Sequence, residues 1–210
     1  MTLTKATIRD FDERAPTGDE TETATFALGC FWGPDAEFGA MDGVIRTRVG
    51  YAGGTKPNPT YRALGDHTEA FQVEYDPAVV SYADLLEVVF RSHDPRHQTA
   101  KTQYQNVVFA ADASQRTALD SYLDAAGLGV EGIETRIERL SRFHPAEDYH
   151  QKYSLRSQES LMDAFTDAGY DDEALRESAA AAKLNGSAAG HDVDAAAELG
   201  LTDDRVARHP

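Results

Sequence analysis

The sequence predicts an α+β fold: a ferredoxin-like βαββαβ unit with a mixed sheet, followed by a helical C-terminal extension. Two observations predict the first part. Short apolar runs bounded by Gly, Pro or Asp alternate with longer helical segments. Their order between residues 24 and 110 is strand, helix, strand, strand, helix, strand. A third observation predicts the extension: from about residue 154 the chain is rich in Ala and takes a helical pattern.

The first strand is predicted at 24–28, where Ala-Thr-Phe-Ala-Leu forms a short apolar run. A helix at 34–40 follows, because Pro34 suits the first turn of a helix. Gly43 then interrupts the chain, and the next apolar run predicts a strand at 44–51.

A loop rich in Gly and Pro separates this strand from a third, predicted at 70–75. The second helix is predicted at 85–92, because its apolar residues form a broad buried side and Ser81 offers a cap. A fourth strand is predicted at 106–110.

Asp112 is the expected cap of a third helix, which should run to about Ala126 and end before Gly127. Alternation of residues then predicts a last strand at 134–140. Three further helices are expected at 157–168, 172–184 and 192–199.

The changes of composition divide the chain into three parts. Residues 1–22 are polar and are expected to form a flexible or extended arm. Residues 23–156 form the α+β domain, and residues 157–210 form the acidic helical extension.

The charge balance is strongly acidic, with 20 Lys and Arg against 36 Asp and Glu, a net charge of −16. A nucleic-acid partner is not expected, because a phosphate backbone requires a basic face. A large net charge repels itself in a compact chain unless salt screens it. We interpret the acidity as an adaptation to high salt; an ordinary acidic cytosolic protein is the alternative.

The chain has a single cysteine, so it forms no internal disulfide, which fits a reducing compartment. Residues 1–23 lack an apolar stretch of signal-peptide length, and no window approaches a membrane span. We therefore expect a soluble cytoplasmic protein without a membrane partner.

That cysteine, Cys30, lies in the pentapeptide Gly-Cys-Phe-Trp-Gly, between the first predicted strand and the first predicted helix. Unpaired N–H groups at a helix start favour negative charge, so this position favours a thiolate of lowered pKa. The residues alone leave two interpretations open: a reactive thiol, or a small buried apolar side chain.

The pentapeptide resembles the active-site signature of the A-type peptide methionine sulfoxide reductases. The resemblance covers residues 22–156 and extends to blocks that follow in the order of that family. These blocks are 49–54, 58–61, 67–70, 73–77, 93–95, 102–104 and 146–151.

The resemblance implies a peptide-methionine (S)-S-oxide reductase with an α+β catalytic domain. Cys30 would attack the sulfoxide sulfur, Glu69 would supply a proton to the oxygen, and Tyr61 and Tyr104 would donate hydrogen bonds to it. Residues expected to line the substrate are Phe31, Trp32, Tyr51, Glu147 and His150.

The resemblance implies no bound cofactor. Cys30 would become a sulfenic acid after oxygen transfer. Because the chain has no second thiol, an external thiol would restore it: thioredoxin, a glutaredoxin-like protein or a small thiol. The expected partners are this reductant and oxidised methionine, free or in proteins.

Other interpretations of the site residues stay open without the resemblance. Glu69 could be a solvated residue at a strand start. Tyr61 and Tyr104 could be tyrosines at the edge of the core, with satisfied hydroxyls.

A metal site is a further alternative, because His93 and His97 flank Asp94. Pro95 lies between the two histidines and prevents a regular helical face, and no third ligand follows at zinc spacing. We therefore expect no metal.

The sequence departs from the family pattern in two ways. The stretch between Tyr61 and Glu69 is shorter than usual, and Thr99 stands where the family usually has an aspartate. Lys101 and Gln105 replace the usual Gly and Arg of the same block.

Asp94 and Asp66 are the acids that could replace the missing aspartate. The departure supports a second hypothesis: an altered, non-catalytic relative that keeps the pocket and binds methionine-like ligands or a partner protein.

Overall fold

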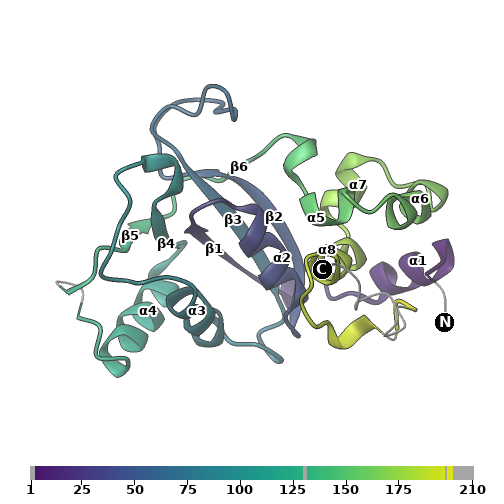
Figure 1. Ribbon diagram of the computed structural model, residues 1–210. Helices are drawn as coiled ribbons and strands as arrows, with labels where there is room; N and C mark the ends of the chain where they lie inside the picture. The colour runs from purple at the N-terminus through teal and green to yellow at the C-terminus, as the bar shows by residue number, and fades with distance from the viewer. Residues whose placement is uncertain (1–2, 130–131, 197, 201–210) are drawn as a thin grey trace.

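The computed structural model describes residues 3–129, 132–196 and 198–200 (Figure 1). Within them, six strands form one mixed sheet in the order β5-β4-β1-β3-β2-β6. Neighbouring strands are antiparallel except β4 and β5, which are parallel. The strands are β1 (Glu22–Leu28), β2 (Val44–Ala52), β3 (Thr68–Tyr75), β4 (Asn106–Ala110), β5 (Arg136–Arg139) and β6 (His144–Pro145).

Two helices supply the crossovers of the sheet. α2 (Trp32–Ala40) connects β1 to β2, and α3 (Tyr82–Arg91) connects β3 to β4. The connectivity is βαββαβ and the central order is β4-β1-β3-β2, which is the ferredoxin-like arrangement. The predicted fold class is therefore confirmed, with β5 and β6 added at the two edges.

Alternation along β1 shows why both crossover helices cover one face of the sheet. Phe26 packs in the main core with Phe38 of α2 and Leu85 of α3. The next residue, Ala27, points to the other face and joins Phe109 in a smaller cluster. The main core therefore lies between the sheet and its helices (Figure 1).

Predicted caps begin two of these helices. At α3, the Ser81 hydroxyl accepts a hydrogen bond from the Asp84 N–H at 3.2 Å, and the Asp84 carboxylate accepts one from the Ser81 N–H at 2.8 Å. At α4 (Ala113–Ala125), the Asp112 carboxylate accepts a hydrogen bond from the Gln115 N–H at 2.9 Å. These caps satisfy N–H groups that a helix start leaves unpaired.

The expectation of a flexible or extended N-terminal arm is wrong for residues 5–14, which form the helix α1 (Lys5–Arg14). Ile8 of this helix is fully buried in a second apolar core, together with Phe165 and Leu184. The polar composition concealed α1, because its few apolar residues find partners only in the distant C-terminal helices. Figure 1 shows α1 beside those helices, away from the sheet edge formed by β5.

The C-terminal part is helical, as predicted, but its elements differ. They are α5 (Tyr153–Arg156), α6 (Glu159–Asp167), α7 (Asp172–Arg176) and α8 (Ala179–Ala188). The helix predicted at 172–184 is divided, because Ser178 leaves the helical path and its hydroxyl accepts a hydrogen bond from the Ala181 N–H at 2.9 Å. In place of the helix predicted at 192–199, the described residues contain only the 3-10 turn Asp194–Ala196.

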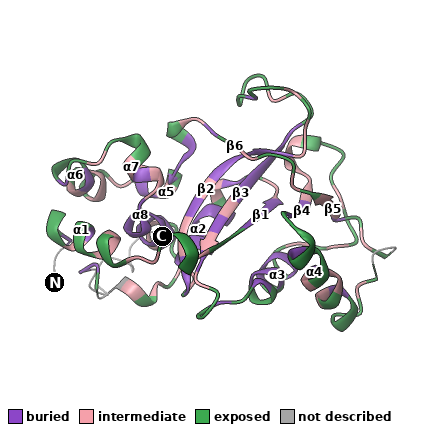
Figure 2. Ribbon diagram, turned by 180° about the vertical axis from the view of Figure 1, so that it is seen from behind, coloured by how far each residue is buried: buried purple, intermediate pink, exposed green. Residues whose placement is uncertain are grey.

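α8 packs directly on α2, the helix that follows Cys30. A Cβ added at Gly39 would lie 2.6 Å from the Ala182 carbonyl oxygen, and one added at Gly186 would lie 2.7 Å from the Ala40 Cβ. The two helices therefore need glycine where they cross. Figure 2 shows α8 as a buried element. The division of the chain at residues 22 and 156 stays a prediction.

None of the helices in the described ranges is long and apolar enough to cross a membrane.

Candidate active site

Cys30 lies where the sequence predicts it, between the end of β1 at Leu28 and the start of α2 at Trp32. Gly29 makes the turn with φ of +71°, a conformation that glycine adopts without strain. This turn directs the chain away from the sheet and leaves Cys30 exposed. The thiol is thereby open to a substrate and to a second thiol.

The pKa of Cys30 is raised, in the opposite direction to the expectation from its helix-start position. Partial removal of the thiol from water is the largest cause; the Trp32 N–H lowers the pKa, and the negative charge of Glu69 raises it. The helix start therefore does favour the thiolate, but desolvation and the nearby carboxylate outweigh it.

Glu69 lies near the start of β3, opposite Tyr51 of β2, and is 1% exposed. Its Oε2 accepts a hydrogen bond from the Phe31 N–H at 3.3 Å, and its Oε1 accepts one from the Gln103 amide at 2.6 Å. The alternative of a solvated residue is therefore wrong for Glu69.

Burial raises the pKa of Glu69, and this effect outweighs the hydrogen bonds from Gln103 and Phe31 and the positive charge of Lys101, which lower it. A buried carboxyl of raised pKa keeps its proton to higher pH, as a general acid requires. Gln103 is a site residue whose contact the sequence motif did not reveal.

The two tyrosines come from separate loops and meet through their side chains. Tyr61 lies between β2 and β3, and Tyr104 ends the 3-10 turn Thr102–Tyr104. The neighbouring Tyr61 side chain, burial, and the charges of Glu69 and Cys30 raise the pKa of Tyr104 to about 12. The Tyr104 phenol is therefore protonated at neutral pH, near the Glu69 carboxyl and the Cys30 thiol.

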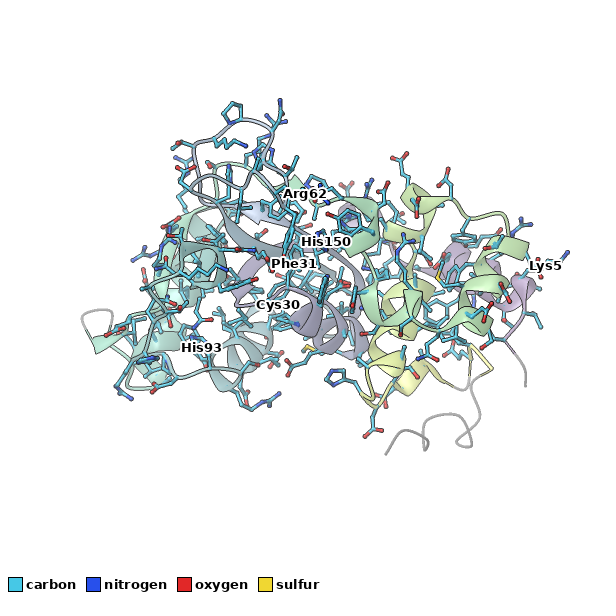
Figure 3. The ribbon with its side chains drawn as sticks, turned by 45° about the horizontal axis from the view of Figure 1, so that its top comes forward. Lys5, Cys30, Phe31, Arg62, His93 and His150 are labelled. Carbon is cyan, nitrogen blue, oxygen red and sulfur yellow. The ribbon has the colours of Figure 1, made fainter. Side chains whose placement is uncertain are left out.

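An aromatic wall adjoins the thiol. The Phe31 ring centroid is 5.1 Å from that of His150, and Trp32 stacks on Tyr153 with centroids 3.7 Å apart and planes 7° apart. Tyr61 completes the wall at 4.8 Å from His150. Figure 3 shows Cys30, Phe31 and His150 in the same region. These rings give the surface beside Cys30 a mainly aromatic character.

His150 is 2% exposed, and neither of its ring nitrogens has a hydrogen-bond partner among the described residues. Burial lowers its pKa, against the opposing charge of Glu147, so the ring is neutral at pH 7. An unpaired buried imidazole beside the thiol offers a polar contact within the aromatic wall.

Glu147 connects two tyrosines of the site through hydrogen bonds to its carboxylate. Its Oε2 accepts a hydrogen bond from the Tyr51 hydroxyl at 2.7 Å, and its Oε1 accepts one from the Tyr61 N–H at 3.0 Å. Burial alone would raise the pKa of Glu147, but these hydrogen bonds outweigh it and the pKa is lowered. The Glu147 carboxylate thus holds the loop of Tyr61; its contact with substrate, like that of Tyr51, stays a prediction.

A buried ion pair links four segments of the chain: α2, β2, the residues around Lys152, and α8. Lys152 and Asp35 are both fully buried, with Nζ 3.1 Å from Oδ1. The Lys152 ammonium also donates to the Thr47 hydroxyl at 2.9 Å, and Asp35 Oδ2 accepts from the Asn185 amide of α8 at 2.9 Å. Lys152, two residues after His150, has φ of 55° in the left-handed region, and its side chain is fully buried.

Thr99 and the two acids that could replace the family aspartate form hydrogen bonds within their own loops. Thr99 is exposed, and its hydroxyl accepts a hydrogen bond from the Lys101 N–H at 3.3 Å. Asp66 accepts hydrogen bonds from Thr55 and Lys56, and Asp94 accepts one from the Arg96 N–H. The carboxylates of Asp66 and Asp94 therefore accept hydrogen bonds from residues of their own loops.

The ring nitrogens of His93 bond to the Val89 carbonyl oxygen at 2.8 Å and the Thr135 hydroxyl at 2.7 Å. Across residues 3–129, 132–196 and 198–200, no three His, Cys, Asp or Glu side chains are grouped to hold a metal ion.

Comparison with known proteins identifies the family of this chain. The profile of the peptide methionine sulfoxide reductase family matches residues 22–182. The peptide methionine sulfoxide reductase A5 of Oryza sativa subsp. japonica is 43% identical over 176 residues, which cover 80% of this chain and 68% of the rice protein.

Two solved structures share the fold. Methionine sulfoxide reductase A of Corynebacterium diphtheriae is 35% identical with a TM-score of 0.55, covering 67% of this chain and 76% of that chain. Reduced Mxr1 of Saccharomyces cerevisiae is 27% identical with a TM-score of 0.58, covering 70% of this chain and 91% of that chain. The match of the family profile over most of the sequence, and of these structures over the fold, shows that the chain belongs to the peptide methionine sulfoxide reductase A family.

Proposed function

We propose that this chain reduces methionine S-sulfoxide, free or in proteins, by attack of the Cys30 thiolate on the sulfur, with Glu69 as the general acid. Membership of the family makes the chain an oxidoreductase that reduces methionine sulfoxide. The observation that carries the residue assignment is the hydrogen bond from the Phe31 N–H to the buried Glu69 carboxyl, since Phe31 directly follows Cys30.

Cys30 and Glu69 share one mobile proton in this proposal. The charge of Glu69 raises the pKa of Cys30, and burial raises the pKa of Glu69. Two neighbouring anions in a partly desolvated site repel each other, so the pair keeps one proton over a broad pH range. The reactive form carries a thiolate on Cys30 and the proton on Glu69.

The proposed chemical step needs no cofactor, because the atoms and electrons of Cys30, Glu69 and the sulfoxide balance. The Cys30 thiolate attacks the sulfoxide sulfur and the Glu69 proton moves to the sulfoxide oxygen. The S–O bond breaks as the hydroxyl passes to Cys30, which leaves the thioether and Cys30 as a sulfenic acid. Cysteine sulfur is oxidised by two electrons and the sulfoxide is reduced by two.

The surrounding groups support this step. The hydroxyls of Tyr61 and Tyr104 donate hydrogen bonds to the oxygen as negative charge develops on it. The rings of Phe31 and Trp32 and the neutral His150 form the wall against the methyl group. The raised pKa of Tyr104 keeps that phenol in its donor form.

An external thiol completes the cycle, because Cys30 is the only cysteine. A thiol attacks the sulfenic acid sulfur, water leaves, and a mixed disulfide forms; a second thiol then releases Cys30. Thioredoxin, a glutaredoxin-like protein and a small thiol are the candidate reductants. The single cysteine and the net charge of −16 favour a reducing, salt-rich cytoplasm as the compartment.

An epimer-resolved assay tests this function. One equivalent of a methionine sulfoxide substrate, without reductant, should yield one equivalent of methionine from the S epimer and leave a dimedone-reactive Cys30. Cys30→Ser should give neither product. Binding of the S epimer without any methionine formed would instead support the non-catalytic relative.

A further inference from the structure

The two loops that carry the site tyrosines each bring an exposed cation beside its tyrosine. Arg62 follows Tyr61 directly, and Lys101 precedes Tyr104 by three residues. The Lys101 ammonium lies 4.3 Å from the centroid of the Tyr104 ring, within cation–π distance. The charge of Lys101 also lowers the pKa of Glu69, and the Tyr61 side chain raises the pKa of its neighbour Tyr104, so both cations lie near the site.

These cations differ from most of the arginines on the sheet. Arg46, Arg48 and Arg136 each pair with a Glu side chain. Among the ion pairs within the part of the chain that the structure describes, none includes Lys101 or Arg62. The chain has 36 acidic residues against 20 basic ones, so partners for cations are plentiful elsewhere. Both side chains are free to contact an anion from solution.

A contact between these cations and an anion would matter most in the step in which an external thiol reduces Cys30, because the chain as a whole carries a net charge of −16. A negatively charged small molecule is repelled by the acidic surface as a whole. A thiol that carries a carboxylate must nevertheless reach the sulfur of Cys30. Two exposed cations beside the site make the local electrostatic field less negative where the thiol approaches Cys30.

We propose that Lys101, with Arg62, binds the carboxylate of a small anionic thiol and directs its sulfur to the Cys30 sulfenic acid. The proposal rests on the proposed function, since it needs that intermediate. The bound thiolate forms an S–S bond with Cys30, the S–O bond breaks, and the departing hydroxide takes up a proton to become water. A second thiol then attacks the mixed disulfide and releases Cys30 and an external disulfide.

The thiol step can be measured apart from substrate reduction. Cys30 is first converted to the sulfenic acid with one equivalent of substrate, and the product is removed. Second-order rates are then measured for 3-mercaptopropionate, 2-mercaptoethanol and cysteamine, each corrected for its thiolate fraction. The anionic, neutral and cationic thiols differ mainly in charge, so the rate ratios isolate the electrostatic contribution.

Lys101→Met keeps the aliphatic stem that covers Tyr104 but removes the charge. We expect it to lower the ratio of the rate with 3-mercaptopropionate to that with 2-mercaptoethanol by about threefold to tenfold. Lys101→Met with Arg62→Met should lower the ratio further, and Lys101→Arg should restore it. Added salt should lower the ratio in the unaltered chain, because ions screen exposed charges.

Lys5→Met is the matched control, because Lys5 lies on α1, far from Cys30 (Figure 3). It should leave the ratio unchanged. A ratio that Lys101→Met does not move would overturn the proposal. The proposal would also be overturned if the charge of Lys101 affected only substrate reduction. That result would appear as a different rate for free methionine sulfoxide and for its neutral amide, with no effect on the thiol step. Failure of Cys30 to become dimedone-reactive would overturn the proposed function itself, and this proposal with it.

Discussion

The Glu69 carboxyl accepts a hydrogen bond from the backbone N–H of Phe31, at 3.3 Å. This contact ties a buried acid on β3 to the residue that follows Cys30 in the chain. It joins the turn that carries Cys30 to β3, a strand next to β1, and so limits how far the proposed nucleophile and the proposed acid can move apart. Their charges are coupled for the same reason.

Glu69→Gln should lower the rate of methionine sulfoxide reduction by about a hundredfold or more, because the amide cannot supply the proton to the oxygen. The measurement is single-turnover methionine formation. Glu87→Gln is the control, since Glu87 is an exposed residue of α3. Wild-type activity in Glu69→Gln would mean that the acid is another group.

The same substitution should make Cys30 more acidic. The charge of Glu69 raises the pKa of Cys30, so removing that charge lowers it. Iodoacetamide labelling of Glu69→Gln should therefore show a midpoint at lower pH than the unaltered chain. A midpoint at the same or a higher pH would show that the charge of Glu69 does not raise the pKa of Cys30. The shared proton would then have no place in the mechanism.

Lys101→Met should shift the pH profile of substrate reduction. Lys101 lowers the pKa of Glu69, so its loss raises that pKa and Glu69 keeps its proton to higher pH. The falling limb of kcat/KM that reports Glu69 should move to higher pH, whereas Lys101→Arg should leave it in place. The coupling of Lys101 to Glu69 is contradicted if the falling limb of kcat/KM moves to lower pH in Lys101→Met. It is also contradicted if the limb moves by the same amount in Lys101→Met and Lys101→Arg.

The sequence predicted the central sheet and the position of the thiol because both depend on short-range patterns. The apolar run before Cys30 predicted β1, and the helix that follows began within two residues of its predicted start at Pro34. The family blocks also identified Glu69, Tyr61 and Tyr104, which the structure brings to one site. Their catalytic roles stay predictions.

Long-range contacts could not be predicted in this way. The pKa of Cys30 is raised by partial burial and by the charge of Glu69, and the local sequence pattern contains neither. The stacking of Trp32 on Tyr153 and the pairing of Lys152 with Asp35, which are 117 positions apart, have no periodic signal. The helix α1 was missed for the same reason, since its buried Ile8 packs in a core formed mainly by residues from the distant C-terminal part of the chain.

The acidic composition predicts that salt stabilises the fold. Screening relieves repulsion among the excess negative charges, so the Tm should rise by about 5 °C or more between low and molar KCl. Thermal melts in sucrose serve as the control, because sucrose stabilises by exclusion from the surface and screens no charge. A Tm that is flat in KCl would favour the ordinary acidic cytosolic protein.

The buried pair of Lys152 and Asp35 should be essential to stability. Lys152→Met leaves the Asp35 carboxylate buried without its cation, which costs about 3–5 kcal/mol of the free energy of unfolding. Adding Asp35→Asn should recover part of that loss, because no uncompensated charge then remains. Arg116→Met breaks the exposed pair with Asp120 and should cost about 0.5 kcal/mol or less. Urea denaturation followed by circular dichroism measures all three, and a Lys152→Met loss no larger than that of Arg116→Met would show that this pair does not hold α2, the strand β2 and α8 together.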